Sequence, residues 1–211
     1  MRISEIFTSI QGESTYAGRL CTFVRAAGCN LECTYCDTPY ARDGGEEMTV
    51  EAVLDAVAAG RCTLVEITGG EPLLQSDTLK LSQQLLDKGY TVLLETNGTI
   101  DVSPVDERVV KIVDIKCPGS GMSDKTMWEN LDLLNPHDEV KFVISDEKDY
   151  DWARDVVGRY GLIARNPVLL SPAHGLLESR RLAEWIVRDR FDARLQLQLH
   201  RIIWPDVERG V

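Results

Sequence analysis

The sequence predicts an α/β fold in which about six or seven mostly parallel strands alternate with helices. Short apolar runs alternate along the chain with segments whose apolar residues recur at helical spacing. A helix that connects two strands returns the chain to the start of the next parallel strand, so this alternation favours a parallel sheet with right-handed crossovers. The 211 residues are enough for one sizeable core, and we expect one domain over residues 1–211.

Each expected element rests on its apolar pattern. The apolar runs that predict strands are, in chain order, 21–24, 64–67, 92–94, 109–115, 140–144, 168–170 and 195–199. Apolar residues at helical spacing predict helices at Val50, Val53, Leu54 and Val57, at Leu81 and Leu85, at Trp152, Val156 and Tyr160, and at Leu182, Trp185 and Ile186. These elements fit either an open doubly wound sheet or an incomplete barrel, which periodicity alone does not separate.

The loops after the expected strands carry the unusual residues. They read GCNLECTYCDTP after the first strand, TGGEP after the second, ETNGT after the third, DIKCPGSG after the fourth and SPAHG after the sixth. Ligands collect outside the carboxyl ends of parallel strands. Both architectures therefore predict that these loops form the functional site.

The composition narrows the class of protein. A net charge of -11 repels nucleic-acid phosphates and the chain has no dense run of Lys and Arg, so we expect no nucleic-acid partner. No stretch reaches the roughly 20 apolar residues of a membrane helix, and the start lacks the pattern of a secretion signal, so we expect no membrane contact and a cytoplasmic location. In that reducing compartment the six cysteines are better explained by metal binding or burial than by disulfides.

Cys29, Cys33 and Cys36 follow the first expected strand with the spacing C-x3-C-x2-C. Thiolates are soft ligands that suit zinc or iron–sulfur clusters, and close spacing lets all three come from one loop. Structural zinc sites and electron-transfer clusters normally use four protein ligands, so three ligands leave one coordination position open. A zinc knuckle or three buried thiols are the alternatives. The other cysteines show no comparable grouping and receive no role: Cys21, Cys62 and Cys117.

Two motifs together resemble the radical S-adenosylmethionine superfamily. The cluster loop, residues 28–38, has Tyr35 just before its last cysteine, and the next strand is followed by Gly69-Gly70-Glu71-Pro72. The resemblance implies that the three cysteines hold a [4Fe-4S] cluster whose open iron is chelated by the amino and carboxylate groups of S-adenosylmethionine. Reduction of the cluster would then give a 5′-deoxyadenosyl radical, and the Gly-Gly-Glu-Pro segment would contact the amino group of the cofactor.

A wider set of segments is similar to the 7-carboxy-7-deazaguanine synthase family and covers nearly the whole chain. These segments are EIFTSIQGE, Arg25, Cys36-Asp37-Thr38, TGGEP, ETNGT and LQLH. The resemblance implies an incomplete TIM-like barrel and a carbon–nitrogen lyase that converts 6-carboxy-5,6,7,8-tetrahydropterin to 7-carboxy-7-deazaguanine, with ring contraction and loss of ammonia. The product lies on the route to queuosine and related 7-deazapurines. The family uses magnesium and is commonly a homodimer, and the superfamily implies a small electron donor such as flavodoxin or ferredoxin.

The resemblance also assigns site residues. Those that would contact S-adenosylmethionine are Tyr35, Cys36, Asp37, Gly69, Gly70, Glu71, Asp114, Ile115, Lys116, Ser171, Pro172, Ala173 and His174. Those that would contact the pterin are Ile10, Gln11, Gly12, Glu13, Arg25, Thr68 and His200, and Thr38 would hold magnesium. A guanidinium and an amide-rich segment suit a flat anionic ring with many hydrogen-bonding edges. No proton-transfer residue is assigned, because the cofactor carries the hard chemistry.

Several of these residues have plainer interpretations on local sequence alone. Residues 11–13 fit a surface turn, Arg25 a surface ion pair, Asp37-Thr38 a turn cap and His200 a core or edge-strand histidine. Two other functions are left open: an activase that installs a glycyl radical on a partner protein, and a non-enzymatic module for structural zinc or electron transfer. The C-terminal WPDVERGV has no assigned role.

Overall fold

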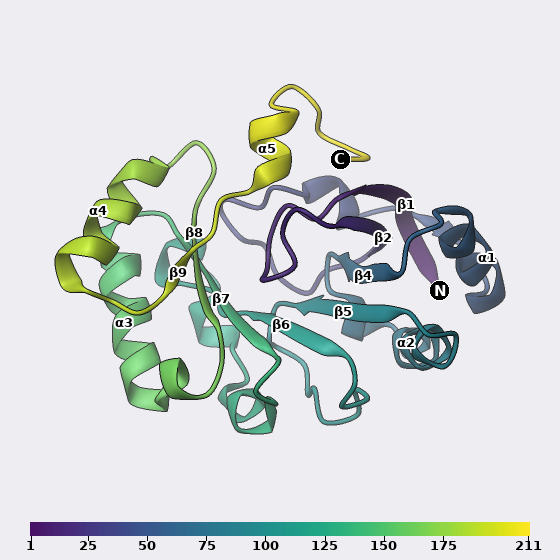
Figure 1. The fold of residues 1–211 in the computed structure, drawn as a ribbon, viewed down its shortest axis with the longest axis horizontal. Helices are drawn as coiled ribbons and strands as arrows, with labels where there is room; N and C mark the ends of the chain where they lie inside the picture. Colours follow the sequence, from purple (N-terminus) through teal and green to yellow (C-terminus); the bar gives the residue numbers. More distant parts are fainter.

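One sheet of nine strands organises the computed structural model, which describes residues 1–211 (Figure 1). The strands are β1 (Arg2–Ile10), β2 (Leu20–Ala26), β3 (Glu46–Glu47), β4 (Leu64–Gly69), β5 (Thr91–Thr96), β6 (Val110–Asp114), β7 (Glu139–Ile144), β8 (Val168–Pro172) and β9 (Arg194–Leu195). Their spatial order is β3-β1-β2-β4-β5-β6-β7-β8-β9. β1 is antiparallel to β2 and β3, whereas every neighbouring pair from β2 to β9 is parallel.

Helices follow most of the parallel strands. The α-helices are α1 (Val50–Ala59), α2 (Asp77–Asp87), α3 (Glu147–Tyr160), α4 (Ser179–Asp189) and α5 (Leu199–Ile203). Short 3-10 helices lie in the loops at Pro39–Ala41, Pro72–Leu74, Pro118–Ser120, Ser123–Lys125, Trp128–Leu133 and Leu162–Ala164. Thr49 and Asp146 start α1 and α3, because their side chains accept backbone N–H groups that the first helical turn leaves free. None of the helices combines the length and the apolar character that crossing a lipid bilayer requires.

The strand order decides between the two architectures that periodicity left open. From β2 to β9 each parallel strand is added on the same side of the previous one, without the reversal of a doubly wound sheet. Right-handed crossovers in one direction place α1 to α4 on one face, and Figure 1 shows these helices around the outside of the curved sheet. The edge strands β3 and β9 have two residues each and do not pair with one another, so the barrel is incomplete.

Alternation along the strands gives the sheet an apolar outer face and a mixed inner face. In β4, Val65 and Ile67 belong to an outer cluster of 15 buried apolar residues shared with α1 and α2. Glu66 and Thr68, between and after them, point to the opposite side and line a pocket. A second outer cluster, of 17 residues, lies between β6 to β8 and the helices α3 and α4. The two larger clusters of the core therefore form between sheet and helices, whereas the inner face combines a smaller apolar cluster of six residues with polar side chains.

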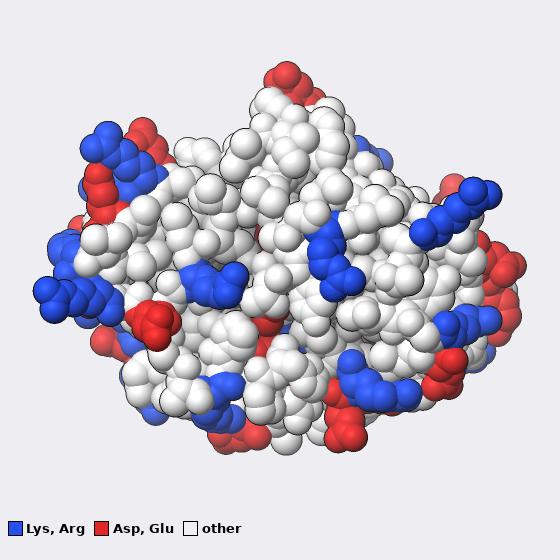
Figure 2. Space-filling view, viewed as in Figure 1, with Lys and Arg blue, Asp and Glu red and all other residues white.

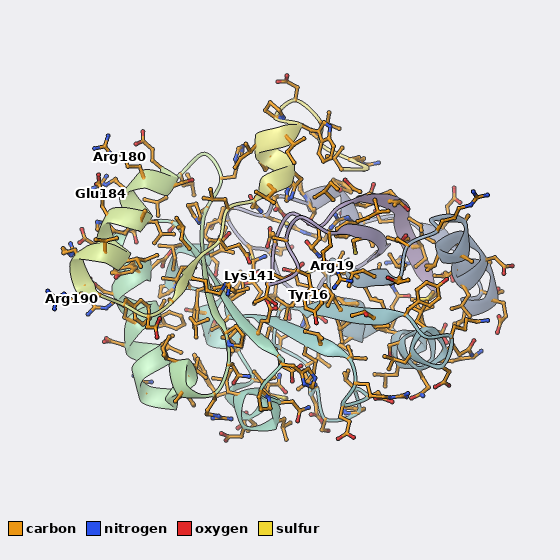
Figure 3. The ribbon with its side chains drawn as sticks, viewed as in Figure 1. Tyr16, Arg19, Lys141, Arg180, Glu184 and Arg190 are labelled. Atoms are coloured by element: carbon orange, nitrogen blue, oxygen red, sulfur yellow. The ribbon has the colours of Figure 1, made fainter.

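The loop between β1 and β2, residues 11–19, fills part of the concave side. The Ser14 N–H donates to Gln196 Oε1 (2.7 Å), and the Thr15 N–H donates to the buried carboxylate of Glu139 (3.1 Å). Figure 3 shows Tyr16 and Arg19 of this loop near the middle of the view, whereas α4 lies at its outer edge. The loop thus joins the first hairpin to β7 and to the segment after β9.

The predicted fold class and most predicted elements are confirmed. The six strands expected between residues 21 and 170 correspond to β2, β4, β5, β6, β7 and β8, and the expected helices correspond to α1 to α4. The strand expected at 195–199 is wrong beyond Leu195. The Gln196 N–H makes the last backbone hydrogen bond to β8, at Leu170 O (2.8 Å). The side-chain amides of Gln196 and Gln198 then donate to Glu13, and the chain turns into α5. β1 was not expected, because its half-buried sequence mixes apolar and polar positions.

Candidate functional site

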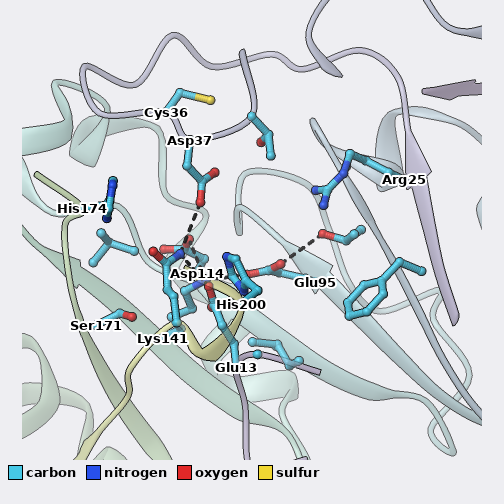
Figure 4. Close-up of a pocket in the computed structure, with 18 of the residues that line it drawn as sticks. Glu13, Arg25, Cys36, Asp37, Glu95, Asp114, Lys141, Ser171, His174 and His200 are labelled. Atoms are coloured by element: carbon cyan, nitrogen blue, oxygen red, sulfur yellow. Dashed lines mark hydrogen bonds and ion pairs between the residues drawn. The ribbon is translucent and has the colours of Figure 1, made fainter. Parts of the chain in front are cut away.

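A pocket opens at the carboxyl ends of β2 and β4 to β8, on the inner face of the sheet (Figure 4). Its walls include the loop 11–19, the cluster loop 28–38 and the C-terminal segment, residues 198–211. All the site residues that the sequence singled out line this pocket, except Glu71 and Ile115. Gln11 is only 2% exposed, so the interpretation of residues 11–13 as a surface turn is wrong.

The three cysteines of the cluster loop face this pocket together. Cys29, Cys33 and Cys36 all line it, and Asn97 Nδ2 lies 3.9 Å from Cys29 Sγ as a donor. Hydrogen bonds from Thr34 to the 3-10 turn at residues 118–120 hold the loop in place (2.7 and 3.1 Å). No set of three or more His, Cys, Asp or Glu side chains is close enough to hold a single metal ion. A four-iron cluster is larger than one ion, and three soft thiols around a common hollow fit it.

The glycines after β4 bring that strand end against the cluster loop. The Gly70 N–H donates to Ala26 O (3.1 Å), and the next N–H along the chain donates to Gly28 O (2.8 Å). A Cβ on Gly69 would lie 2.2 Å from Ala26 O, and one on Gly70 would lie 2.2 Å from Gly28 O. Gly69 also has φ of +143°, which side chains rarely allow. Both glycines are therefore required for the contact between the two motifs.

Glu71 supports this contact from behind the pocket. Its buried carboxylate accepts hydrogen bonds from Thr96 Oγ1 (2.9 Å), Asn97 N (2.7 Å) and Leu73 N (3.0 Å). Ile115, the other predicted residue that does not line the pocket, is buried in the outer core. The side chains of these two residues position the loops around the pocket and do not face it.

Asp114 and Lys116 form an ion pair in the pocket wall. Lys116 Nζ lies 2.8 Å from Asp114 Oδ2, and Asp114 Oδ1 is buried without any hydrogen-bond partner. Burial alone would lower the pKa of Lys116, but the charge of Asp114 outweighs it and raises that pKa. An unpartnered buried acceptor is costly, so Asp114 Oδ1 suits a ligand that brings a hydrogen-bond donor.

The floor of the pocket is a network of buried charges. Lys141 Nζ donates to Glu95 (2.7 Å) and to Glu13, and it lies 3.9 Å from Asp114. Thr68 Oγ1 donates to the second oxygen of Glu95 (3.0 Å). Burial would raise the pKa of Glu95, but the charge and hydrogen bond of Lys141 outweigh burial and lower it to about 2. Glu95 is therefore held as a carboxylate.

Arg25 is an ion-pair partner inside the pocket and not on the outer surface, with its side chain 15% exposed. Its Nε donates to Glu5 Oε1 (2.7 Å), which also accepts the Tyr40 hydroxyl (2.8 Å). The guanidinium lies over the Phe7 ring, 5.8 Å from its centroid, and Figure 4 shows it pointing into the pocket. It is thus a positive group available to an anionic ligand.

The C-terminal segment forms part of the pocket wall, and of its residues only His200 was predicted to lie there. Gln198 Nε2 donates to Glu13 (2.8 Å) and to Asp37 (3.2 Å), and Arg209 lies 4.0 Å from the centroid of the Tyr40 ring. His200 lines the pocket, and burial lowers its pKa, so it is neutral at physiological pH. The late LQLH motif was the available signal for this segment.

Three charged residues of the floor were also missed: Glu66, Glu95 and Lys141. Glu66 and Lys141 interrupt apolar strands, in LVEITG and EVKFVI. Glu95 begins the ETNGT segment, which was singled out without a role for this residue. Strands of a parallel sheet are normally apolar on both faces. A charged residue between apolar ones in such a strand, as at Glu66 and Lys141, was therefore a signal for a functional inner face.

Comparison with known proteins gives the family. The model described as the Radical SAM superfamily matches residues 23–157. The 7-carboxy-7-deazaguanine synthase of Chlorobaculum tepidum is 47% identical over 214 residues, which cover 100% of this chain and 97% of the relative. The protein of the same name from Koribacter versatilis is 44% identical over 100% of both chains. Among solved structures, QueE from Escherichia coli matches with a TM-score of 0.76 and 23% identity over 93% of each chain.

These matches agree with the geometry of the pocket. The matched range contains the cluster loop and the Gly-Gly-Glu-Pro segment, and the full-length relatives also cover the C-terminal segment. The structural likeness supports the incomplete barrel. Enzymes of this superfamily use a [4Fe-4S] cluster and S-adenosylmethionine. The chain therefore belongs to the radical S-adenosylmethionine superfamily and, within it, to the 7-carboxy-7-deazaguanine synthases, which are lyases.

Proposed function

We propose that the chain converts 6-carboxy-5,6,7,8-tetrahydropterin to 7-carboxy-7-deazaguanine, with ring contraction and loss of ammonia, on the route to queuosine and related 7-deazapurines. The proposal is supported by the names of the full-length relatives. The observation that carries it is that one pocket is lined both by the three cluster-loop thiols and by a floor of charged and amide groups. A flat heterocycle with a carboxylate suits such a floor.

The cofactors are assigned to one side of the pocket. We propose that Cys29, Cys33 and Cys36 hold the cluster. The proposed contacts of S-adenosylmethionine are Tyr35, Cys36, Asp37, the backbone at Gly69 to Glu71, Asp114, Lys116 and Ser171 to His174. The unpartnered Asp114 Oδ1 supports this assignment, because the cofactor has ammonium and hydroxyl donors. When bound, cluster and cofactor supply the radical that removes a hydrogen atom from C6 of the pterin.

The substrate is assigned to the floor and to Arg25. The guanidinium is held by Glu5 and suits the carboxylate of the pterin, while Glu13 and Thr68 suit its ring edges. Ile10, Gln11, Gly12 and His200 complete the proposed contacts. The loop 11–19 and the C-terminal segment form walls of the pocket and would limit the access of water to a bound substrate.

Magnesium is assigned to Thr38. This residue lines the pocket beside Asp37, and its side chain does not cap the 3-10 helix at Pro39–Ala41, which leaves the hydroxyl for a ligand. Magnesium takes oxygen ligands and commonly keeps several waters, so one hydroxyl together with substrate oxygens fits its chemistry. When bound there, the ion would orient the substrate carboxylate.

The remaining parts of the proposal concern the setting of the enzyme. We propose that residues 1–211 work as one unit, in the cytoplasm, as a homodimer, with flavodoxin or ferredoxin as the electron donor. A nucleic-acid partner is not part of the proposal: on the face drawn in Figure 2, Lys and Arg side chains are scattered among Asp, Glu and neutral groups. A glycyl-radical activase is disfavoured, because the C-terminal segment takes up part of the wall of the pocket that a protein loop would have to enter.

The reaction is tested with anaerobically reconstituted protein, reductant, S-adenosylmethionine and the carboxytetrahydropterin. We expect 5′-deoxyadenosine and a deazapurine product. Cys33→Ser should abolish both products. Cys62→Ser is the matched control and should retain both, because the Cys62 thiol lies outside the pocket, in a hydrogen bond with the Thr22 hydroxyl. Cofactor cleavage without a deazapurine product rejects the substrate assignment.

A further inference from the structure

Glu66 is a buried carboxyl group of the pocket floor that none of the roles above uses. It lies on β4, lines the pocket and is 5% exposed. Its side chain accepts one hydrogen bond, from Gln11 Nε2, and has no second partner. A buried carboxyl group must either be paired with a cation or stay neutral. The groups around Glu66 decide which form it takes.

The Gln11 amide faces Glu66 only as a donor. Gln11 Oε1 accepts the backbone N–H of Glu13 (3.0 Å), which leaves Nε2 for Glu66 Oε2. Glu66 Oε1 has no protein partner and stays in contact with the open space of the pocket. If Glu66 is neutral, its proton is therefore on Oε1 and is available to a ligand.

The charges around Glu66 favour the neutral form. Lys141, on β7, donates to Glu13 of the loop and to Glu95 of β5, but not to Glu66. Burial and then the negative charges of Glu95 and Glu13 raise the pKa of Glu66 to about 8. The thiol of Cys21, which also faces Glu66 from β2, has a raised pKa as well and stays uncharged. The floor thus contains two carboxylates and one neutral acid.

We propose that Glu66 is a specificity-determining residue that, as a neutral acid, donates its O–H to the ring carbonyl oxygen of the substrate. This inference rests on the proposed pterin substrate, whose pyrimidine ring has a carbonyl acceptor beside N–H donors. The carboxylates of Glu13 and Glu95 are acceptors and suit the N–H donors, whereas the carbonyl oxygen needs a donor. The floor therefore distinguishes a 4-oxo ring from a 4-amino ring. With a 4-amino ring, the N–H of the amino group and the O–H of Glu66 are both donors and face each other without an acceptor.

The protonation state of Glu66 is measured first, without a substrate. Infrared difference spectra of the reconstituted protein between pH 7 and pH 10 should contain a carboxylic-acid band that disappears as Glu66 ionises. Glu66→Gln should lack this band. A wild-type protein without the band at pH 7, or the same band in E66Q, overturns the proposal.

Binding is then measured by calorimetry with 6-carboxypterin, an oxidised ring without the hydrogen that the reaction removes. The wild-type Kd should rise about tenfold from pH 7 to pH 9, as a group with a pKa of about 8 ionises. In E66Q the new amide oxygen accepts the hydrogen bond from Gln11, so the amide N–H faces the pocket at every pH. The rise of Kd between pH 7 and pH 9, called the pH step below, should therefore disappear. Titration of the ligand itself is common to both proteins and cancels in the ratio of their Kd values.

Glu95→Gln is the matched control, because Glu95 is a buried pocket carboxyl on the neighbouring strand that is bound by Lys141. This variant keeps Glu66 and removes a repelling charge, so the step should shift to lower pH and remain. A step that E95Q removes and E66Q retains overturns the proposal.

Ligand preference separates this inference from the proposed function. Wild-type protein should bind 6-carboxypterin at least about tenfold more tightly than its 4-amino analogue at pH 7, and Glu66→Ala should reduce that ratio. Tight binding with no preference and no pH step rejects the role of Glu66 alone. If neither pterin binds although the infrared band is present, the proposed substrate is rejected, and with it the role of Glu66 in recognising that substrate.

Discussion

Lys141 is the ammonium group on which the pocket floor depends. It is buried, donates to Glu95 (2.7 Å) and to Glu13, and lies 3.9 Å from Asp114. Lys141→Met keeps the length of the apolar stem but leaves buried carboxyl groups without their cation. Breaking a buried ion pair by removing one partner costs about 3–5 kcal/mol. We expect the free energy of unfolding to fall by about this amount at pH 7.

The loss should depend on pH with a definite sign. In the wild-type protein the pKa of Glu95 is about 2, below its ordinary value, because Lys141 outweighs the effect of burial. A lowered pKa stabilises the fold above the unfolded pKa of about 4.3, and that contribution is lost as the pH falls toward 2. In K141M, burial without the cation raises the pKa of Glu95, so protonation relieves the unpaired charge. The difference between wild type and variant should therefore shrink from pH 7 to pH 5.

Urea unfolding followed by tryptophan fluorescence measures this difference at each pH. Lys80→Met is the matched control, because Lys80 pairs with Glu51 (3.3 Å) on the exposed surface. This substitution should lower the free energy of unfolding by less than about 1 kcal/mol. A loss below about 1 kcal/mol in K141M, or a loss that grows as the pH falls, would refute the role assigned to Lys141.

Three further variants test the loops around the pocket. Gly70→Ala should lower the iron content after reconstitution, because its methyl group would lie 2.2 Å from Gly28 O, whereas Gly158→Ala, with open space around it, should bind iron normally. Glu71→Gln should lower the free energy of unfolding in urea by about 1–3 kcal/mol, because a buried carboxylate that accepts several hydrogen bonds is lost. The same variant should bind S-adenosylmethionine more weakly in calorimetry. Deletion of residues 207–211 should raise the ratio of 5′-deoxyadenosine to product, measured by chromatography, because the pocket loses part of its wall; an unchanged ratio would contradict this.

The loop residues of the site were predictable because their chemistry is concentrated in short motifs after strands. The three cysteines of the cluster loop lie within eight positions of each other, and one loop brings them to the pocket. Lys141 belongs to no such motif, and its one local signal, a charge inside an apolar strand, does not identify its partners. It meets Asp114 only because β6 and β7 pair in the register that sets these two residues side by side. Register between strands depends on the whole sheet, so this contact could not be predicted from a single strand.

Glu71 and the C-terminal segment show two other limits of sequence reasoning. Glu71 shares a motif with Gly70, yet its carboxylate turns away from the pocket to accept two backbone N–H groups and a hydroxyl. A motif therefore identifies a site without separating residues that contact a ligand from those that support the loop. The segment after Leu195 alternates apolar and polar residues as a strand does, but Gln196 and Gln198 are held by partners far away in the sequence.

An incomplete barrel needs other parts of the chain to close its inner face, and Glu13 joins those parts. Its carboxylate accepts from Lys141 in the floor and from Gln198 in the C-terminal segment (2.8 Å). Gln198 in turn donates to Asp37 (3.2 Å), which directly follows the last cysteine of the cluster loop. The pocket floor, the C-terminal segment and the cluster loop are thus connected through three consecutive contacts: Lys141 to Glu13, Glu13 to Gln198, and Gln198 to Asp37. One amide group, that of Gln198, bonds both Glu13 and Asp37, so a substitution of Gln198 removes a side-chain link of the C-terminal segment to the loop 11–19 and to the residue after Cys36 at once.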